Sequence, residues 1–215
     1  MFVYFAMLGG VSDRDTTPLP EDKLQRLIAL AREGDQVALQ RIYEQFVNRV
    51  FRVVRPMFVS EAEAEDVTQD SLLKVLTSLE SYRPRPESRF SSWVLRIAYN
   101  TARRRFRRRR MVPTDPIELA SVLEAESNKD EPMDMEEGID TERRRSIVLR
   151  ALWQVPERER EVISLRYGAE LNASEVATIT GLNPANVRKI CERLRPRLRE
   201  QIELLLNQQH LGETP

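Results

Sequence analysis

Apolar positions in the first part of the chain recur at helical spacing, with turn residues between the segments. The first segment spans 22–33 and ends at Gly34, and Asp35 then stands where it can cap a second helix. Ser60 and Glu63 form a capping-box pattern that predicts the start of a third helix. The residues expected on the inner side of this third helix are Val67, Leu72, Leu73, Leu76 and Leu79.

A loop and a fourth helix complete this first part. Two prolines within 82–88 argue against helix there, and a helix is expected from about Phe90, with Trp93 on its inner side. The same helix ends in an arginine run, because 8 arginines and no acid lie between Arg96 and Arg110. The helix dipole accounts for two or three cations at such an end. Eight of them favour a polyanion, whose phosphates would neutralise their mutual repulsion.

The pattern in the second part of the chain predicts a helix-turn-helix unit. Asn172 and Glu175 form a cap pair for a short helix, in which Ala177 is small enough for a close helix crossing. Gly181 follows four residues later, where a tight turn needs a positive φ. Pro184 then occupies the first position of the next helix. An ordinary helical hairpin with a solvated cationic face is the alternative.

The second helix of this unit has a basic outward side. Six cations and one anion lie between positions 184 and 199. In helix-turn-helix proteins the corresponding helix enters the major groove of DNA. The residues expected on the outward side are Asn186, Arg188, Lys189, Glu192, Arg193, Arg195, Arg197 and Arg199.

Charge is segregated along the 215 residues, although the formal net charge is zero. Residues 1–111 have a net charge of +6, residues 112–142 of −10 and residues 143–215 of +4. Two basic lobes, 1–111 and 143–215, therefore flank an acidic strap, 112–142, and this segregation indicates a polyanion partner. The alternative is that the charges belong to the solvated faces that many helical proteins have. We interpret the strap as a flexible linker, and hypothesise that it lies across the basic lobes and mimics DNA.

Composition excludes several classes of protein. One Cys cannot form an intramolecular disulfide, and a single His argues against a His-based metal site or triad. Without a nucleophile–base pair, a glycine-rich phosphate loop or a metal cluster, we expect no enzyme, no cofactor and no metal. The apolar run in residues 1–11 is shorter than the roughly 20 residues of a membrane span, so we expect a cytoplasmic protein without membrane insertion.

Three motifs in this order resemble bacterial sigma factors of the extracytoplasmic-function (ECF) group. The segment Glu63–Leu76 resembles the family's helix for binding core polymerase, and Phe90–Arg103 resembles its promoter-melting and minus-ten region. Val155–Leu198 resembles its minus-thirty-five domain. One departure stands before the helix-turn-helix unit, where Glu170 occupies a position at which the family usually has Gly.

The expected fold is therefore all-α, with two small helical domains joined by an acidic flexible linker, the second a helix-turn-helix domain. The expected boundaries are 1–20 for a loose tail, 21–111 for a sigma region 2-like domain, 112–142 for the linker, 143–206 for a sigma region 4-like domain and 207–215 for a tail.

The resemblance also implies roles for individual residues. Those implied to bind core polymerase are Glu65, Asp66, Gln69, Asp70 and Lys74. Those implied to recognise and melt the minus-ten element are Arg83, Arg85, Phe90, Trp93, Arg96, Asn100, Arg103 and Arg104. Those implied to read the minus-thirty-five element are Asn186, Arg188, Lys189, Glu192 and Arg193. The implied partners are core RNA polymerase, through its β′ clamp and β flap, promoter DNA and an anti-sigma factor.

A stand-alone helix-turn-helix regulator is the alternative function. This function would account for the second lobe but would leave the motifs of the first lobe unexplained. Sequence-specific binding to DNA by the protein alone would favour it, because sigma lobes are expected to bind promoters poorly without core polymerase.

Overall fold

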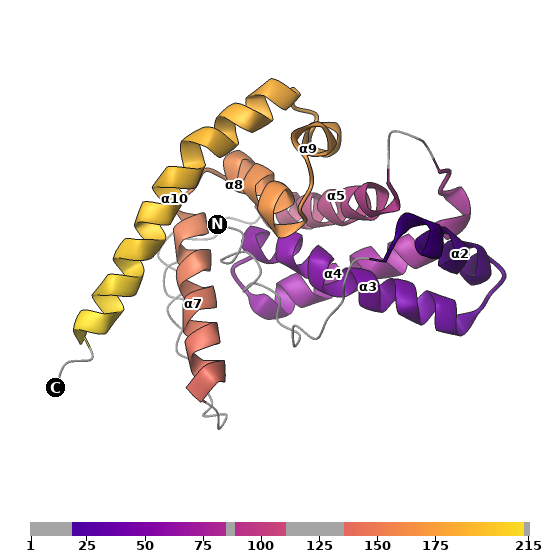
Figure 1. Cartoon of the computed structure of the whole chain (residues 1–215), viewed down its shortest axis with the longest axis horizontal. Coiled ribbons are helices and arrows are strands. Elements are labelled where there is room, and N and C mark those ends of the chain that lie inside the picture. The colour runs from indigo at the N-terminus through magenta and orange to yellow at the C-terminus, as the bar shows by residue number, and fades with distance from the viewer. Residues whose placement is uncertain (1–18, 85–88, 111–135, 213–215) are drawn as a thin grey trace. The chain divides into compact units, whose positions relative to one another are not determined.

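The computed structural model describes residues 19–84, 89–110 and 136–212, and every element of three or more residues within these ranges is a helix. The helices form two compact units, one made of α2 to α5 and the other of α7 to α10 (Figure 1). This confirms the prediction of an all-α fold in two parts. No helix in the described ranges is long and apolar enough to cross a membrane. Most of the acidic strap lies outside the described residues, as do residues 1–18 of the predicted tail.

The first unit begins with two helices joined by a tight turn. Gly34 has a φ of +90°, a conformation that residues with a Cβ rarely adopt. Asp35 then caps the next helix, because its Oδ1 accepts hydrogen bonds from the backbone N–H groups of Val37 and Ala38 at 2.8 and 3.0 Å. The elements of this unit are α2 (Glu21–Arg32), α3 (Gln36–Val54), a 3₁₀ turn (Arg55–Met57), α4 (Glu61–Thr77), a second 3₁₀ turn (Leu79–Ser81) and α5 (Phe90–Arg110).

The core of the first unit lies where α3 meets both α4 and α5. Ile42 and Val50 from α3, Leu72 from α4 and Leu95 from α5 are fully buried there. The prediction that Leu73 lies on the inner side of α4 is wrong, since 62% of its surface is exposed. One residue of helix turns a side chain by about 100°, so Leu72 and its neighbour point to different faces of α4.

The second unit contains a helix pair and the predicted helix-turn-helix. Its elements are α7 (Glu136–Trp153), α8 (Glu157–Ile163), a π-helical turn (Ser164–Gly168), α9 (Ala173–Thr180) and α10 (Pro184–Gly212). Two of these helices extend past the expected limits of the domain, since α7 begins inside the expected linker and α10 continues beyond position 206. The C-terminal half of α10 still has an apolar side, where Ile202 is 2% exposed, and α10 packs along α7. That packing stabilises the pair α7 and α10.

The turn chemistry of the helix-turn-helix is as predicted. Asn172 and Glu175 form a reciprocal capping box at the start of α9. Gly181 ends α9 with a φ of +72°. At the start of α10, Asn183 Oδ1 accepts a hydrogen bond from the N–H of Ala185 at 2.8 Å. Glu170 also has a positive φ, of +58°, which is unusual for a residue with a side chain.

Candidate nucleic-acid interface

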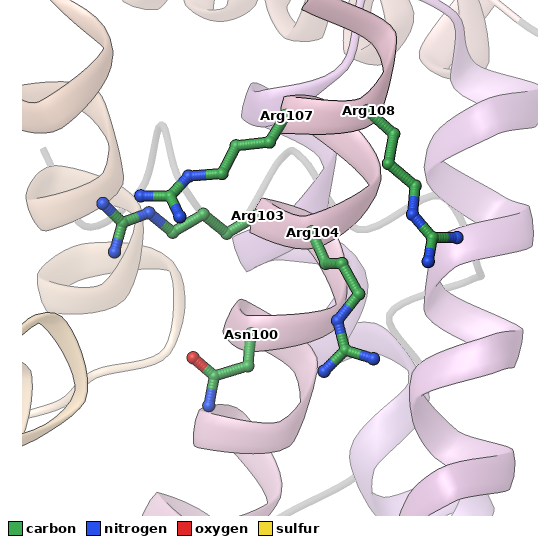
Figure 2. A pocket seen from close by; sticks show the side chains of 5 residues that line it. All are labelled: Asn100, Arg103, Arg104, Arg107 and Arg108. Atoms are coloured by element: carbon green, nitrogen blue, oxygen red, sulfur yellow. The ribbon is translucent and has the colours of Figure 1, made fainter. Parts of the chain in front are cut away.

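The arginine run of α5 surrounds a hollow along its C-terminal half. Figure 2 shows five side chains that line it, all from successive turns of this one helix: Asn100, Arg103, Arg104, Arg107 and Arg108. Arg103 and Arg107 extend to one side of the helix and Arg104 and Arg108 to the other. Four arginines and one asparagine therefore line one hollow, an arrangement that can bind the phosphates of a nucleic-acid strand.

Two other cations join α5 to α4. Arg105 lies 3.6 Å from the carboxylate of Glu63, and Lys74 donates a hydrogen bond of 3.4 Å to the hydroxyl of Thr101. The half-buried Arg96 has a buried Nε without a hydrogen-bond partner in the described part of the chain. The run is therefore divided, with Arg105 joining α5 to α4 and the hollow-lining arginines pointing outward.

An aromatic cluster lies at the start of α5. The ring of Phe90 packs edge-on against Phe46 and Tyr82, with centroids 5.5 and 4.9 Å apart, and stacks on Trp93 at 5.4 Å. Phe90 is fully buried, so the prediction that its side chain contacts DNA does not fit this structure. The ring instead supports Trp93, which is half-buried.

The loop before α5 is described only in part. The exposed Arg83 donates to the carbonyl oxygens of Glu80 and Tyr82, so its guanidinium is held beside the preceding 3₁₀ turn. Arg85 lies outside the described residues.

One face of α4 is exposed and mostly acidic. The five residues predicted there all lie on the exposed side: Glu65, Asp66, Gln69, Asp70 and Lys74. The opposite side packs in the core through Val67, Leu72 and Val75. Leu73 is the residue that sequence reasoning missed, an exposed leucine three and four positions after Asp70 and Gln69. That helical spacing was the signal for its place on the exposed face.

The outward side of α10 carries the residues predicted to contact DNA. The exposed ones are Asn186, Arg188, Lys189, Glu192 and Arg193. They lie opposite Val187 and Leu194, which are almost fully buried against the rest of the unit. Arg193 also pairs with Glu159 of α8, so one of the predicted DNA contacts already has a protein partner.

Two arginines of α8 join it to neighbouring helices, Arg158 to α9 and Arg160 to α7, and sequence reasoning missed both. Arg158 pairs with the buried carboxylate of Glu161 at 3.0 Å and donates to the carbonyl of Thr180 at the end of α9. The guanidinium of Arg160 is buried and stacks over the ring of Trp153 at 3.9 Å. Burial lowers the pKa of Arg160 to about 10, so it stays charged at neutral pH.

No described residues form a metal site or a reactive thiol. Among the described ranges, no group of three or more His, Cys, Asp and Glu side chains could hold a metal ion. Cys191 is buried in α10, and burial raises the pKa of its thiol.

Two family models match the chain, one in each unit. Residues 42–111 match Sigma-70 region 2, and residues 151–200 match Sigma-70, region 4. The first match contains α4 and α5 together with most of α3, and the second contains α8, α9 and the part of α10 with the basic outward side.

Related proteins match over most of the length. The ECF RNA polymerase sigma-E factor of Salmonella typhimurium is 30% identical over 186 residues, which are 85% of this chain and 95% of that protein. The ECF RNA polymerase sigma factor SigW of Bacillus subtilis is 23% identical over 190 residues, 85% of this chain and 98% of that protein.

Solved structures share the fold at lower identity. CnrH, in complex with the cytosolic domain of CnrY, has a TM-score of 0.54 at 21% identity and covers 84% of this chain and 95% of its own. RpoE of Bartonella quintana, in complex with the anti-sigma factor NepR, has a TM-score of 0.55 at 18% identity. The match covers 76% of this chain and 96% of the RpoE chain.

Proposed function

The chain belongs to the ECF RNA polymerase sigma factors, and we propose that each of its two helical units carries a separate part of promoter recognition. A sigma factor directs the initiation of transcription at specific promoters. The finer assignments below concern which surfaces of this chain bind which partner.

The exposed face of α4 is the surface we assign to core polymerase, at the β′ clamp. The observation that carries this assignment is an acidic helix face with an exposed leucine, inside the region 2 match. Burying Leu73, 62% exposed in the free chain, would remove apolar surface from water. Asp66 and Asp70 would supply the charge that selects a basic partner surface.

The hollow-lining arginines of α5 are the surface we assign to the minus-ten element. Separated strands expose both phosphates and bases, and four outward guanidinium groups suit the phosphates. Asn100 lies among them, where its amide can hydrogen-bond a base edge. The half-buried Trp93, supported by the buried Phe90, offers a ring on which an unstacked base can lie.

The outward side of α10 is the surface we assign to the minus-thirty-five element. The capping box, the positive φ of Gly181 and the buried Val187 are the features of a helix-turn-helix whose second helix enters a major groove. The same unit is the one we expect to contact the β flap of polymerase. Because function needs polymerase, we place the protein in the cytoplasm and assign it no catalytic step of its own.

An anti-sigma factor is the further partner that we propose. The Bartonella neighbour is described in complex with an anti-sigma factor. The exposed face of α4 and the outward side of α10 are the surfaces that such a partner would have to cover to block function. The stand-alone regulator is not favoured, because the region 2 match lies outside the helix-turn-helix unit.

Co-elution with bacterial core RNA polymerase in size-exclusion chromatography tests this function. We expect the full chain to elute with polymerase, and the double variant Asp66→Ala/Asp70→Ala to bind more weakly. Asp22→Ala/Glu33→Ala removes the same charge from exposed positions of α2 and its C-cap and is the matched control. Failure of the folded wild-type chain to co-elute would contradict the sigma assignment. Equal weakening by both variants would contradict the assignment of α4 alone.

A further inference from the structure

Glu192 is the acidic residue at the centre of a basic recognition surface. It is exposed on α10, one turn beyond Arg188 and Lys189 and next to Arg193. The helix side opposite to it is buried through Val187 and Leu194. Its carboxylate therefore lies on the side of α10 that we assign to DNA.

Glu192 has no ion pair within the described part of the chain, in contrast to three other carboxylates of this unit. Glu159 pairs with Arg193, Glu161 with Arg158 and Glu203 with Arg199. The spacing of cations along α10 is less favourable for an ion pair with Glu192. Pro196 stands four residues after it, where a cation would pair well, and Arg188 precedes it in the less favourable order. Arg195, three residues after Glu192, forms no ion pair with it within the described residues.

An unpaired carboxylate facing DNA needs a hydrogen-bond donor, because phosphates repel it. In the major groove, guanine presents only acceptors, and thymine presents an acceptor and a methyl group. Adenine presents its N6 donor beside the N7 acceptor, which repels the second carboxylate oxygen. Cytosine presents its N4 amino group without that neighbouring acceptor and is the base to which Glu is suited.

We propose that Glu192 is a specificity-determining residue that selects one cytosine of the upstream promoter element by accepting a hydrogen bond from its N4 amino group. The inference rests on the proposed function of α10 as the minus-thirty-five reader. Glu192 also lowers affinity for other sequences, since its charge stays unsatisfied and close to phosphate when that cytosine is absent.

Selection from a duplex library tests the base preference. The full chain is combined with core RNA polymerase, and bound DNA is sequenced from a library randomised over the upstream element. We expect the wild type to enrich cytosine at one position by about tenfold over other bases, the discrimination of a good direct contact. Glu192→Gln is expected to prefer adenine at that position, because the amide can bond both N6 and N7. Glu192→Ala is expected to lose the preference there and to retain the rest of the motif.

A matched control and two contrary outcomes complete the test. Glu200→Gln removes an exposed carboxylate farther along α10 and is expected to leave the motif unchanged. If all three Glu192 forms enrich the same base at every position, the cytosine assignment is wrong and the proposed function stands. If the wild type with polymerase enriches no motif at all, both the assignment and the proposed function are wrong.

Discussion

Glu159 of α8 accepts a hydrogen bond from the guanidinium of Arg193 on α10, and the two residues are 34 positions apart in the chain. The arginine side chain is 63% exposed and the glutamate side chain 23%. The pair therefore joins the outward side of the recognition helix to the helix that supports it. It also reduces the positive charge that Arg193 presents to a phosphate.

Removing this pair should change DNA binding more than folding. In Glu159→Gln we expect less than about 1 kcal/mol of lost stability, as is usual for an exposed ion pair. The freed Arg193 should bind one more phosphate, so that the slope of log affinity against log salt for the polymerase complex steepens by about 0.9. Promoter binding measured at several salt concentrations checks this. Glu203→Gln, which removes the carboxylate that pairs with Arg199 farther along α10, is the control. A weaker affinity with an unchanged slope would mean that Glu159 orients Arg193 for binding.

Two adjacent leucines of α4 should behave in opposite ways. Leu72 is fully buried, so Leu72→Ala is expected to lower the free energy of unfolding by about 2 to 5 kcal/mol. Leu73 is 62% exposed, so Leu73→Ala should change stability by less than about 0.5 kcal/mol. Leu73→Ala should remain folded and still weaken co-elution with core polymerase, because the variant loses a contact with polymerase. Any weakening by Leu72→Ala should instead follow from its lower stability. Thermal melting measures the stability of the two variants, and co-elution measures their binding to core polymerase. Strong destabilisation by Leu73→Ala would contradict the exposed position of Leu73.

Backbone strain at Glu170 should be relieved by glycine. Glu170 has a φ of +58°, where a side chain costs energy and glycine does not. Glu170→Gly is therefore expected to raise the stability of the second unit by about 1 kcal/mol, less the entropy that glycine adds to the unfolded chain. Glu170→Ala keeps a Cβ and should show no such gain. Thermal melting of the full-length variants measures this difference. Equal melting temperatures for Glu170→Gly and Glu170→Ala would contradict backbone strain at Glu170.

High pH should destabilise the second unit through Cys191 and Tyr167. Burial raises the pKa of both groups, and each is neutral when protonated. The folded state therefore holds these protons more tightly than the unfolded state. Stability should be full below the pKa values of the unfolded groups and should decline as the pH rises from there toward the higher folded values. Chemical unfolding at several pH values checks the direction.

The same burial of Cys191 predicts slow modification. Because the thiolate is the reactive form, a thiol-specific reagent at neutral pH should label the folded chain much more slowly than the unfolded one. Cys191→Ser abolishes labelling and is the control. Rapid labelling of the folded chain would contradict the buried placement.

The local elements were predictable from short patterns. Caps such as Asn172 with Glu175, and turns such as Gly181, act over three or four residues, so the pattern carries the whole interaction. The packing of α7 against α10 was not predictable in this way, because it joins helices that are distant in the sequence. The acidic composition of 136–142 favoured a linker, yet helix forms there.

By itself, the sequence determined the helices, their caps, the division into two basic parts and the basic character of α5 and α10. Those features depend on residue type and on spacing along a single helix. Only the tertiary structure decided which side chains remain available, because each partner comes from another element. Phe90 is buried by Phe46, Arg193 is paired by Glu159, and the exposed Glu192 has no ion pair within the described part of the chain.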